Sequence, residues 1–199
     1  MDKREYLEYM DTIKAAYERG DMESVVRGAS EVGLTRIRET RVLEMAADAF
    51  IDLGKYEQAR TALKLSFEKH SNSKQLAYRL AELSIALDDL DAAVNYYEAF
   101  CRLAPDDSKR YILKYEIGKA GGVSSKELIK LLEAYNAVEK DDQWEFELAK
   151  MYHEAGRGED CVKVCDDMFV WFGKTEYVKK ALQYKNMYTA LTPGQQAAY

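Results

Sequence analysis

Residues 80–107, LAELSIALDDLDAAVNYYEAFCRLAPDD, decide the fold. After the aspartate pair, apolar residues recur at helical and not strand spacing, at Ala93, Tyr96, Tyr97, Phe100 and Leu103. Asp88 and Asp89 have short polar side chains that suit a chain reversal. Pro105 suits the end of a helix. The stretch therefore predicts two helices joined by a tight turn.

The same pattern recurs every 34 residues along the chain. From Gly54, steps of this length reach small or turn-tolerant residues, namely Gly20, Asp88, Gly122, Gly156 and Ala190. Five residues after each of these positions, the same 34-residue step reaches Val25, Ala59, Ala93, Glu127 and Cys161. A fixed period of this size is typical of helical repeat arrays, in which each hairpin buries its apolar face against its neighbours.

This unit resembles the tetratricopeptide repeat. The matching positions are Leu80, Ala81, Ala93, Tyr97 and Pro105 in one unit, Ala47, Phe50, Gly54, Tyr56 and Ala59 in the preceding unit, and Leu148, Ala149, Tyr152 and Gly156 in LAKMYHEAG. The unit with Gly118 and Glu127 departs from the pattern, and its KAGGVSSKELIKLL segment predicts a longer turn with Ser124 or Ser125 as the helix cap. The resemblance implies an all-α fold, a right-handed α-α superhelical solenoid of about five stacked 34-residue hairpins plus the start of a sixth.

Residues 1–199 are expected to form one solenoid, with units at about 6–39, 40–73, 74–107, 108–141 and 142–175 and a partial unit at 176–199. The last part carries an apolar stripe at Tyr177, Ala181, Tyr184, Tyr188 and Leu191. Thr192-Pro193-Gly194-Gln195 then predicts a helix start with a capping box. We therefore expect the chain to be the N-terminal part of a longer protein. The uncapped end could also join two copies.

Composition limits the partners and the compartment. The net charge is −6, with 29 basic and 35 acidic residues, so the chain lacks a broad basic field for nucleic acid. No apolar run reaches the ~20 residues of a membrane span, and the first residues lack a secretory signal. Three cysteines are an odd count that suits a reducing compartment. We expect a cytoplasmic protein that binds neither nucleic acid nor membrane.

Catalytic and metal-binding motifs are weak. Gly54-Lys55 lies outside the G-x-x-x-x-G-K-[ST] pattern that cradles phosphates, and no strand precedes it. Cys161 and Cys165 lie one helical turn apart, but sister units have core residues at these positions. His153 lacks the second histidine of a zinc-protease motif. We expect no catalytic residues, no metal and no cofactor.

A candidate binding surface lies beside the core stripe on the first helix of each unit. By resemblance, this edge faces a concave groove. Its residues follow i, i+4, i+7 spacing: Glu44, Asp48 and Ile51; Tyr78, Glu82 and Ile85; Ile112, Glu116 and Lys119; Phe146, Lys150 and His153. The middle positions predict an acidic ladder of Asp48, Glu82 and Glu116 that ends at Lys150. The asparagines of the family's best-known peptide clamp are absent. A peptide or partner helix with apolar and some basic residues fits this pattern, although the same residues could pack against neighbouring helices or a later part of the chain.

The sequence thus favours a non-catalytic scaffold or adaptor that binds a protein partner in the groove. One alternative is a regulatory or targeting module attached to a larger C-terminal catalytic or signalling protein. Another is a sensor of a small signalling peptide.

Overall fold

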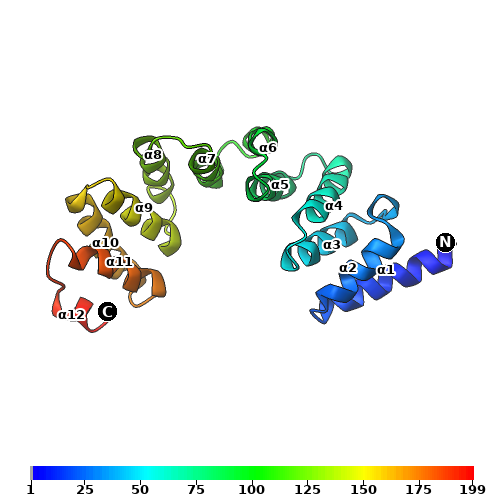
Figure 1. Ribbon diagram of the computed structural model, residues 1–199, viewed down its shortest axis with the longest axis horizontal. Coiled ribbons are helices and arrows are strands. Elements are labelled where there is room, and N and C mark those ends of the chain that lie inside the picture. Colours follow the sequence, from blue (N-terminus) through cyan, green and yellow to red (C-terminus); the bar gives the residue numbers. More distant parts are fainter. Residues whose placement is uncertain (1) are drawn as a thin grey trace. The chain divides into compact units, whose positions relative to one another are not determined.

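The computed structural model describes residues 2–199, which are helical and contain no strand (Figure 1). The helices are α1 (Lys3–Glu18), α2 (Met22–Val32), the 3-10 helix η1 (Leu34–Arg36), α3 (Thr40–Asp52), α4 (Tyr56–Lys69), α5 (Lys74–Ala86), α6 (Leu90–Leu103), α7 (Lys109–Ala120), α8 (Ser125–Asn136), α9 (Asp142–Glu154), α10 (Gly158–Phe172), α11 (Glu176–Asn186) and α12 (Pro193–Gln196). The chain forms two compact units, the first ending at Asp106 and the second spanning Asp107–Tyr199. The all-helical repeat fold expected from the sequence is confirmed.

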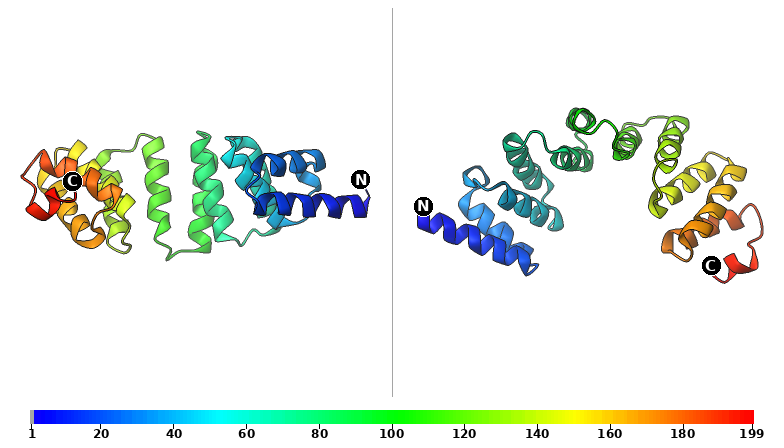
Figure 2. Two further views of the ribbon diagram at one scale, coloured as in Figure 1. Left: turned by 90° about the horizontal axis from the view of Figure 1, so that it is seen from below. Right: turned by 180° about the vertical axis from the view of Figure 1, so that it is seen from behind.

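Consecutive helices pair as antiparallel hairpins (Figure 2). The pairs are α1–α2, α3–α4 and α5–α6 in the first unit, and α7–α8 and α9–α10 in the second. First helices of later hairpins begin at Thr40, Lys74, Lys109 and Asp142, and α11 begins at Glu176. The 34-residue step therefore corresponds to one hairpin.

Residues with a left-handed backbone conformation form the turns of the hairpins. Gly54 has φ 68°, a backbone conformation that glycine adopts without a steric penalty. Asp88 holds the equivalent place with φ 57°, which aspartate tolerates better than most residues. The residue after each turn then donates a hydrogen bond from its backbone N–H to a carbonyl of the preceding helix. The Lys55 N–H, for example, donates to the Phe50 carbonyl oxygen at 2.7 Å. Gly54-Lys55 is therefore a turn and not a phosphate loop.

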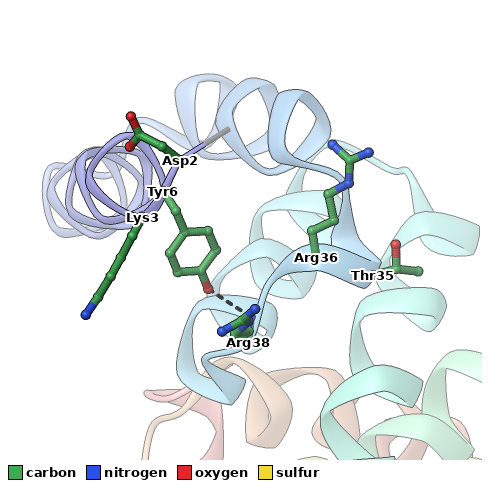
Figure 3. A pocket seen from close by; sticks show the side chains of 6 residues that line it. All are labelled: Asp2, Lys3, Tyr6, Thr35, Arg36 and Arg38. Atoms are coloured by element: carbon green, nitrogen blue, oxygen red, sulfur yellow. Dashed lines mark hydrogen bonds between the residues drawn. The ribbon is translucent and has the colours of Figure 1, made fainter.

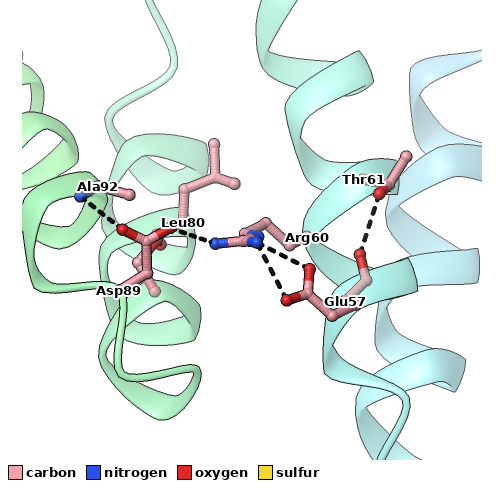
Figure 4. A network of polar contacts seen from close by, with 7 residues as sticks. Glu57, Arg60, Thr61, Leu80, Asp89 and Ala92 are labelled. Atoms are coloured by element: carbon pink, nitrogen blue, oxygen red, sulfur yellow. Dashed lines mark hydrogen bonds and ion pairs between the residues drawn. The ribbon is translucent and has the colours of Figure 1, made fainter.

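The first unit has a continuous apolar core between its hairpins. It is built from the predicted stripes, with Leu43, Ala46, Ala47, Phe50, Ala59, Ala62 and Leu63 all buried. A polar contact also connects the second hairpin to the third (Figure 4). Arg60 of α4 donates to Asp89 at 2.6 Å and to Glu57 at 2.8 Å, while Asp89 caps α6 by accepting from the Ala92 N–H. This arginine therefore ties one helix cap to the neighbouring hairpin.

The second unit contains the irregular hairpin. A Cβ on Gly118 would lie 3.1 Å from a methyl group of Leu128, so glycine allows α7 and α8 to approach closely. The α7–α8 turn is longer than that around Gly54, as predicted. Ser124 occupies the position before α8, but its hydroxyl donates to Glu127 at 3.4 Å and makes no hydrogen bond to the backbone of the helix.

Helix α12 packs against the same unit through a polar network. Thr192 and Gln195 form the predicted capping box. The Gln195 side chain is buried and accepts a hydrogen bond from the Lys185 amine at 2.9 Å. Lys185 also pairs with Asp166, and Gln195 donates to that carboxylate at 2.6 Å. Leu191 is buried in the apolar core of the second unit.

The three cysteines are unpaired thiols with different exposure. Cys161 and Cys165 are buried, and the Cys165 thiol contacts the Ala181 carbonyl oxygen at 3.2 Å. Cys101 is half-exposed on α6. Among residues 2–199, no group of three or more histidine, cysteine, aspartate or glutamate side chains is placed to hold a metal ion. In the same range, no helix has both the length and the apolar character needed to cross a membrane.

Candidate peptide-binding surface

Side-chain contacts join the first helices of neighbouring hairpins in the first unit. The Tyr17 hydroxyl on α1 donates to Oδ2 of Asp48 on α3 at 2.8 Å, and Arg79 on α5 binds the other oxygen of the same carboxylate. The hydrogen bond to Asp48, together with burial, raises the pKa of Tyr17. Asp48 is therefore a bridge between three helices. Its charge is matched by Arg79, so Asp48 does not act as an isolated step of an acidic ladder.

Three of the other predicted residues of the first unit lie together on α5. Tyr78 is half-buried and packs edge-on against Phe100, with ring centroids 5.5 Å apart. Ile85 is also half-buried, whereas Glu82 is exposed. This helix therefore combines an exposed carboxylate with partly accessible apolar side chains.

In the second unit, α7 contributes mainly charged groups to the equivalent surface. Ile112 is only 2% exposed, so it belongs to the core and is not an accessible anchor. Glu116 is half-buried, and Lys119 is exposed. The Lys119 amine binds Glu147 of α9 at 2.6 Å, and the Tyr115 hydroxyl donates to the same carboxylate oxygen at 2.6 Å.

The contacts around Glu147 shift the pKa of two groups. Burial, reinforced by the hydrogen bond to Glu147, raises the pKa of Tyr115 far above its usual range. Burial acts to raise the pKa of Glu147 as well, but the hydrogen bonds from Lys119 and Tyr115 outweigh it and lower the pKa. Tyr115 therefore stays neutral and Glu147 stays ionised at neutral pH.

An aromatic cluster covers α9 and α11. We define it as Phe146, His153, Tyr177, Tyr184 and Tyr188. The Phe146 ring lies 5.7 Å from Tyr177 and 6.0 Å from Tyr184, and the His153 ring lies 4.7 Å from Tyr184. His153 Nδ1 is 2.7 Å from the Tyr188 hydroxyl. Four members are half-buried and Tyr188 is 42% exposed, so the cluster presents a partly accessible aromatic surface.

Sequence reasoning found only part of this surface. It identified Phe146, Lys150 and His153, and the structure brings them together on α9. It placed Tyr177, Tyr184 and Tyr188 on an apolar stripe of the uncapped C-terminal end. In the structure, these three tyrosines contact Phe146 and His153 of α9. Their spacing did place them on one face, which was the available signal. Arg79 and Glu147 were missed, because they lie outside the chosen i, i+4, i+7 positions.

The fold and this surface define a class, the helical-repeat proteins built from antiparallel hairpins. A family model for the tetratricopeptide repeat matches residues 40–68 and 75–107, which are the second and third hairpins. The second and third hairpins therefore match the tetratricopeptide repeat, within a chain whose fold is that of a helical-repeat protein.

Solved structures share the fold at low sequence identity. Residues 41 to the end of MamA from Desulfovibrio magneticus RS-1 are 17% identical, with a TM-score of 0.64 over 96% of this chain and 99% of that chain. A tetratricopeptide repeat protein from Parabacteroides merdae ATCC 43184 is 14% identical, with a TM-score of 0.69 over 94% and 75%. TTC0263, a thermophilic TPR protein from Thermus thermophilus, is 15% identical, with a TM-score of 0.64 over 90% and 97%. A search of curated protein sequences gave no significant match.

Tetratricopeptide repeats generally mediate protein–protein interaction, and proteins built from them are generally not catalytic themselves. A protein partner is therefore the general expectation for a chain of this class.

Proposed function

We propose that this chain is a non-catalytic scaffold or adaptor that binds a peptide or partner helix on its first helices. The observation that carries the proposal is the aromatic cluster. Half-buried aromatic side chains held by ring contacts are rigid, so an apolar residue can pack on them at a small cost in conformational entropy. Phe146, flanked by Tyr177 and Tyr184, is the proposed anchor position.

Charged groups beside the cluster favour a partner with basic as well as apolar residues. Lys150 lies 3.9 Å from both Glu147 and Glu154, so it balances part of their charge without a close contact to either. Glu154 is exposed at the same helix end as His153. In the first unit, Glu82 is proposed to play the same role beside Tyr78 and Ile85. Complementary charges of this kind set orientation and specificity more than affinity.

The surrounding chemistry also suits a cytoplasmic location. All three cysteines are free thiols, which persist best in a reducing compartment. A regulatory or targeting module of a larger protein would use the same surface, and the partner's identity would distinguish that role from a free-standing adaptor.

The test is a peptide selection followed by matched substitutions. Peptides of random sequence would be selected on the folded chain, and the Kd of the best binder measured by calorimetry. Phe146→Ala is expected to weaken binding by about 30-fold, since truncating a central aromatic contact costs about 2 kcal/mol.

Phe67→Ala is the matched control. Phe67 is also half-buried and packs against Tyr96 at 6.1 Å, but it lies on α4, a second helix. Its truncation is expected to leave the Kd unchanged. Equal Kd values for Phe146→Ala and the unmodified chain, or equal losses in both variants, would reject the aromatic cluster as the binding site. Glu82→Lys tests whether the partner is basic. It is expected to raise the Kd for a basic peptide and to leave the Kd for other peptides unchanged.

A further inference from the structure

A hollow of about 640 Å³ lies in the first unit, between the start of α1 and the segment that follows α2 (Figure 3). Asp2, Lys3 and Tyr6 line it from α1 and the residue before it, and Thr35, Arg36 and Arg38 line it from η1 and the next residues. The two elements are joined by a hydrogen bond from the Arg38 backbone N–H to the Tyr6 hydroxyl oxygen at 2.9 Å. The two walls of the hollow are therefore held together by a contact of the fold itself.

Its charged side chains are mostly positive and lack acidic partners. Lys3, Arg36 and Arg38 are exposed, and within residues 2–199 none of them has a carboxylate at ion-pair distance. Lys69 of α4 adds a fourth cation to this region. Its amine donates to the carbonyl oxygens of Ile37 and Arg38 at 2.9 and 3.1 Å. The segment thus concentrates positive charge on a chain whose net charge is −6.

Nearby carboxylates are already occupied by other groups. Asp2 caps α1 by accepting from the Arg4 and Glu5 backbone N–H groups at 2.8 and 2.9 Å. Glu8 pairs with Arg4 at 3.0 Å, and Glu39 pairs with Lys14 at 2.7 Å. Glu8 and Glu39 are thus each paired with another cation, whereas Asp2 keeps its negative charge and lines the hollow together with the three cations Lys3, Arg36 and Arg38.

The donors in the hollow suit oxyanions. Guanidinium groups bind carboxylate or phosphate through two parallel N–H donors, and Arg36 and Arg38 supply two such groups. The Tyr6 hydroxyl accepts from Arg38, so its own hydrogen can be donated to a ligand, and Thr35 offers another hydroxyl. A volume of 640 Å³ exceeds that of a single small ion and lies in the ordinary range of ligand pockets, so it has room for more than one oxyanion group.

We propose that this hollow binds an extended peptide segment of a partner protein that carries clustered oxyanion groups, either carboxylates or phosphates. The site is separate from the aromatic cluster, and its ligand has the opposite charge from the basic partner proposed there. The chain would therefore contact two chemically different segments.

Calorimetry with three synthetic peptides tests the proposal. One peptide carries consecutive glutamates between glycine and serine residues, the second carries phosphoserines at those positions, and the third carries glutamines. The glutamate or phosphoserine peptide is expected to bind, more weakly as salt rises, whereas the glutamine peptide is not. The tighter of the two anionic peptides identifies the source of the oxyanion.

Substitutions locate the binding. Arg36→Gln and Arg38→Gln are each expected to weaken the anionic peptide by about tenfold, because each removes a charge-assisted hydrogen-bonding group. Arg27→Gln, an exposed arginine on α2, makes the same change in net charge and is expected to have no effect. Both side chains in the hollow are exposed, so circular dichroism should show unchanged folding.

Three results would overturn the proposal. These are equal binding of the glutamine peptide, an equal loss in Arg27→Gln, or tighter binding of a single-stranded oligouridine than of either anionic peptide. Phe146→Ala is expected to leave this binding intact, so failure of one site is distinguishable from failure of the other.

Discussion

Replacing Asp48 by alanine is expected to lower the free energy of unfolding of the first unit by about 2 kcal/mol. The substitution removes the acceptor of the Tyr17 hydroxyl, a hydrogen bond of 2.8 Å that is worth about 1 kcal/mol. It also removes the ion pair with Arg79. That pair contributes at most about 1 kcal/mol, because 37% of the Asp48 side chain and 20% of the Arg79 side chain are exposed to solvent.

Urea unfolding followed by far-ultraviolet circular dichroism measures this loss. Tryptophan fluorescence gives an internal comparison, because Trp144 and Trp171 both belong to the second unit. Asp52→Ala is the matched control. Asp52 is exposed on the same helix, and its substitution should change the free energy of unfolding by less than about 0.5 kcal/mol.

A double-mutant cycle separates the two contacts. Tyr17→Phe alone should cost about 1 kcal/mol, and it should cost almost nothing once Asp48 is alanine. If Asp48→Ala were no more destabilising than Asp52→Ala, or if Tyr17→Phe cost the same in both backgrounds, Asp48 would not be a bridge between helices.

Three further changes test the fold. Gly54→Ala should cost about 1 kcal/mol in thermal unfolding, because the left-handed backbone is strained while the added methyl group meets nothing within 4 Å. Tyr115→Phe should make the free energy of unfolding fall less as the pH becomes alkaline, and urea titrations at several pH values measure this change. The raised pKa of Tyr115 beside Glu147 means that its stabilising contribution is complete below the unfolded pKa of about 10 and is lost as pH rises through the folded value. Lys185→Met should cost about 2 kcal/mol in urea unfolding, because it removes the buried cation paired with Asp166.

Each of these changes has a contradicting outcome. A neutral Gly54→Ala would mean that the turn relaxes to another conformation. An unchanged alkaline profile for Tyr115→Phe, compared with the exposed Tyr56→Phe, would mean that Tyr115 does not titrate with unfolding. A gain of stability in Lys185→Met would mean that desolvation of the amine outweighs its contacts.

The 34-residue spacing of the turns was predictable because each turn depends on local backbone geometry. Gly54 and Asp88 lie 34 residues apart, and both adopt the left-handed conformation that a tight turn requires. The irregular α7–α8 hairpin could be located for the same reason. The close approach of Gly118 to Leu128 in this hairpin depends on the packing of two helices and was not visible in the sequence.

The candidate surface was predicted less well, because it depends on offsets between hairpins. Asp48 was expected to form an acidic ladder with Glu82 and Glu116, yet its carboxylate contacts Tyr17 and Arg79, which are each 31 residues away. Ile112 was chosen by its register, but it is only 2% exposed and belongs to the core. Which residues at the edge of an apolar stripe become buried is set by the packing of neighbouring helices and does not follow from the period alone.

The unequal burial of the thiols makes the natural chain a ready substrate for single-site labelling. Cys161 and Cys165 are both enclosed by the core, which keeps a bulky reagent away from their thiols. Contact between the two thiols together with burial raises the pKa of Cys165 well beyond its usual range, whereas the same contact lowers the pKa of Cys161, so Cys161 is protected by its burial. A maleimide dye should therefore attach to Cys101 without any cysteine being replaced. Fluorescence anisotropy from that one position would then report the binding of a large partner to the unmodified sequence.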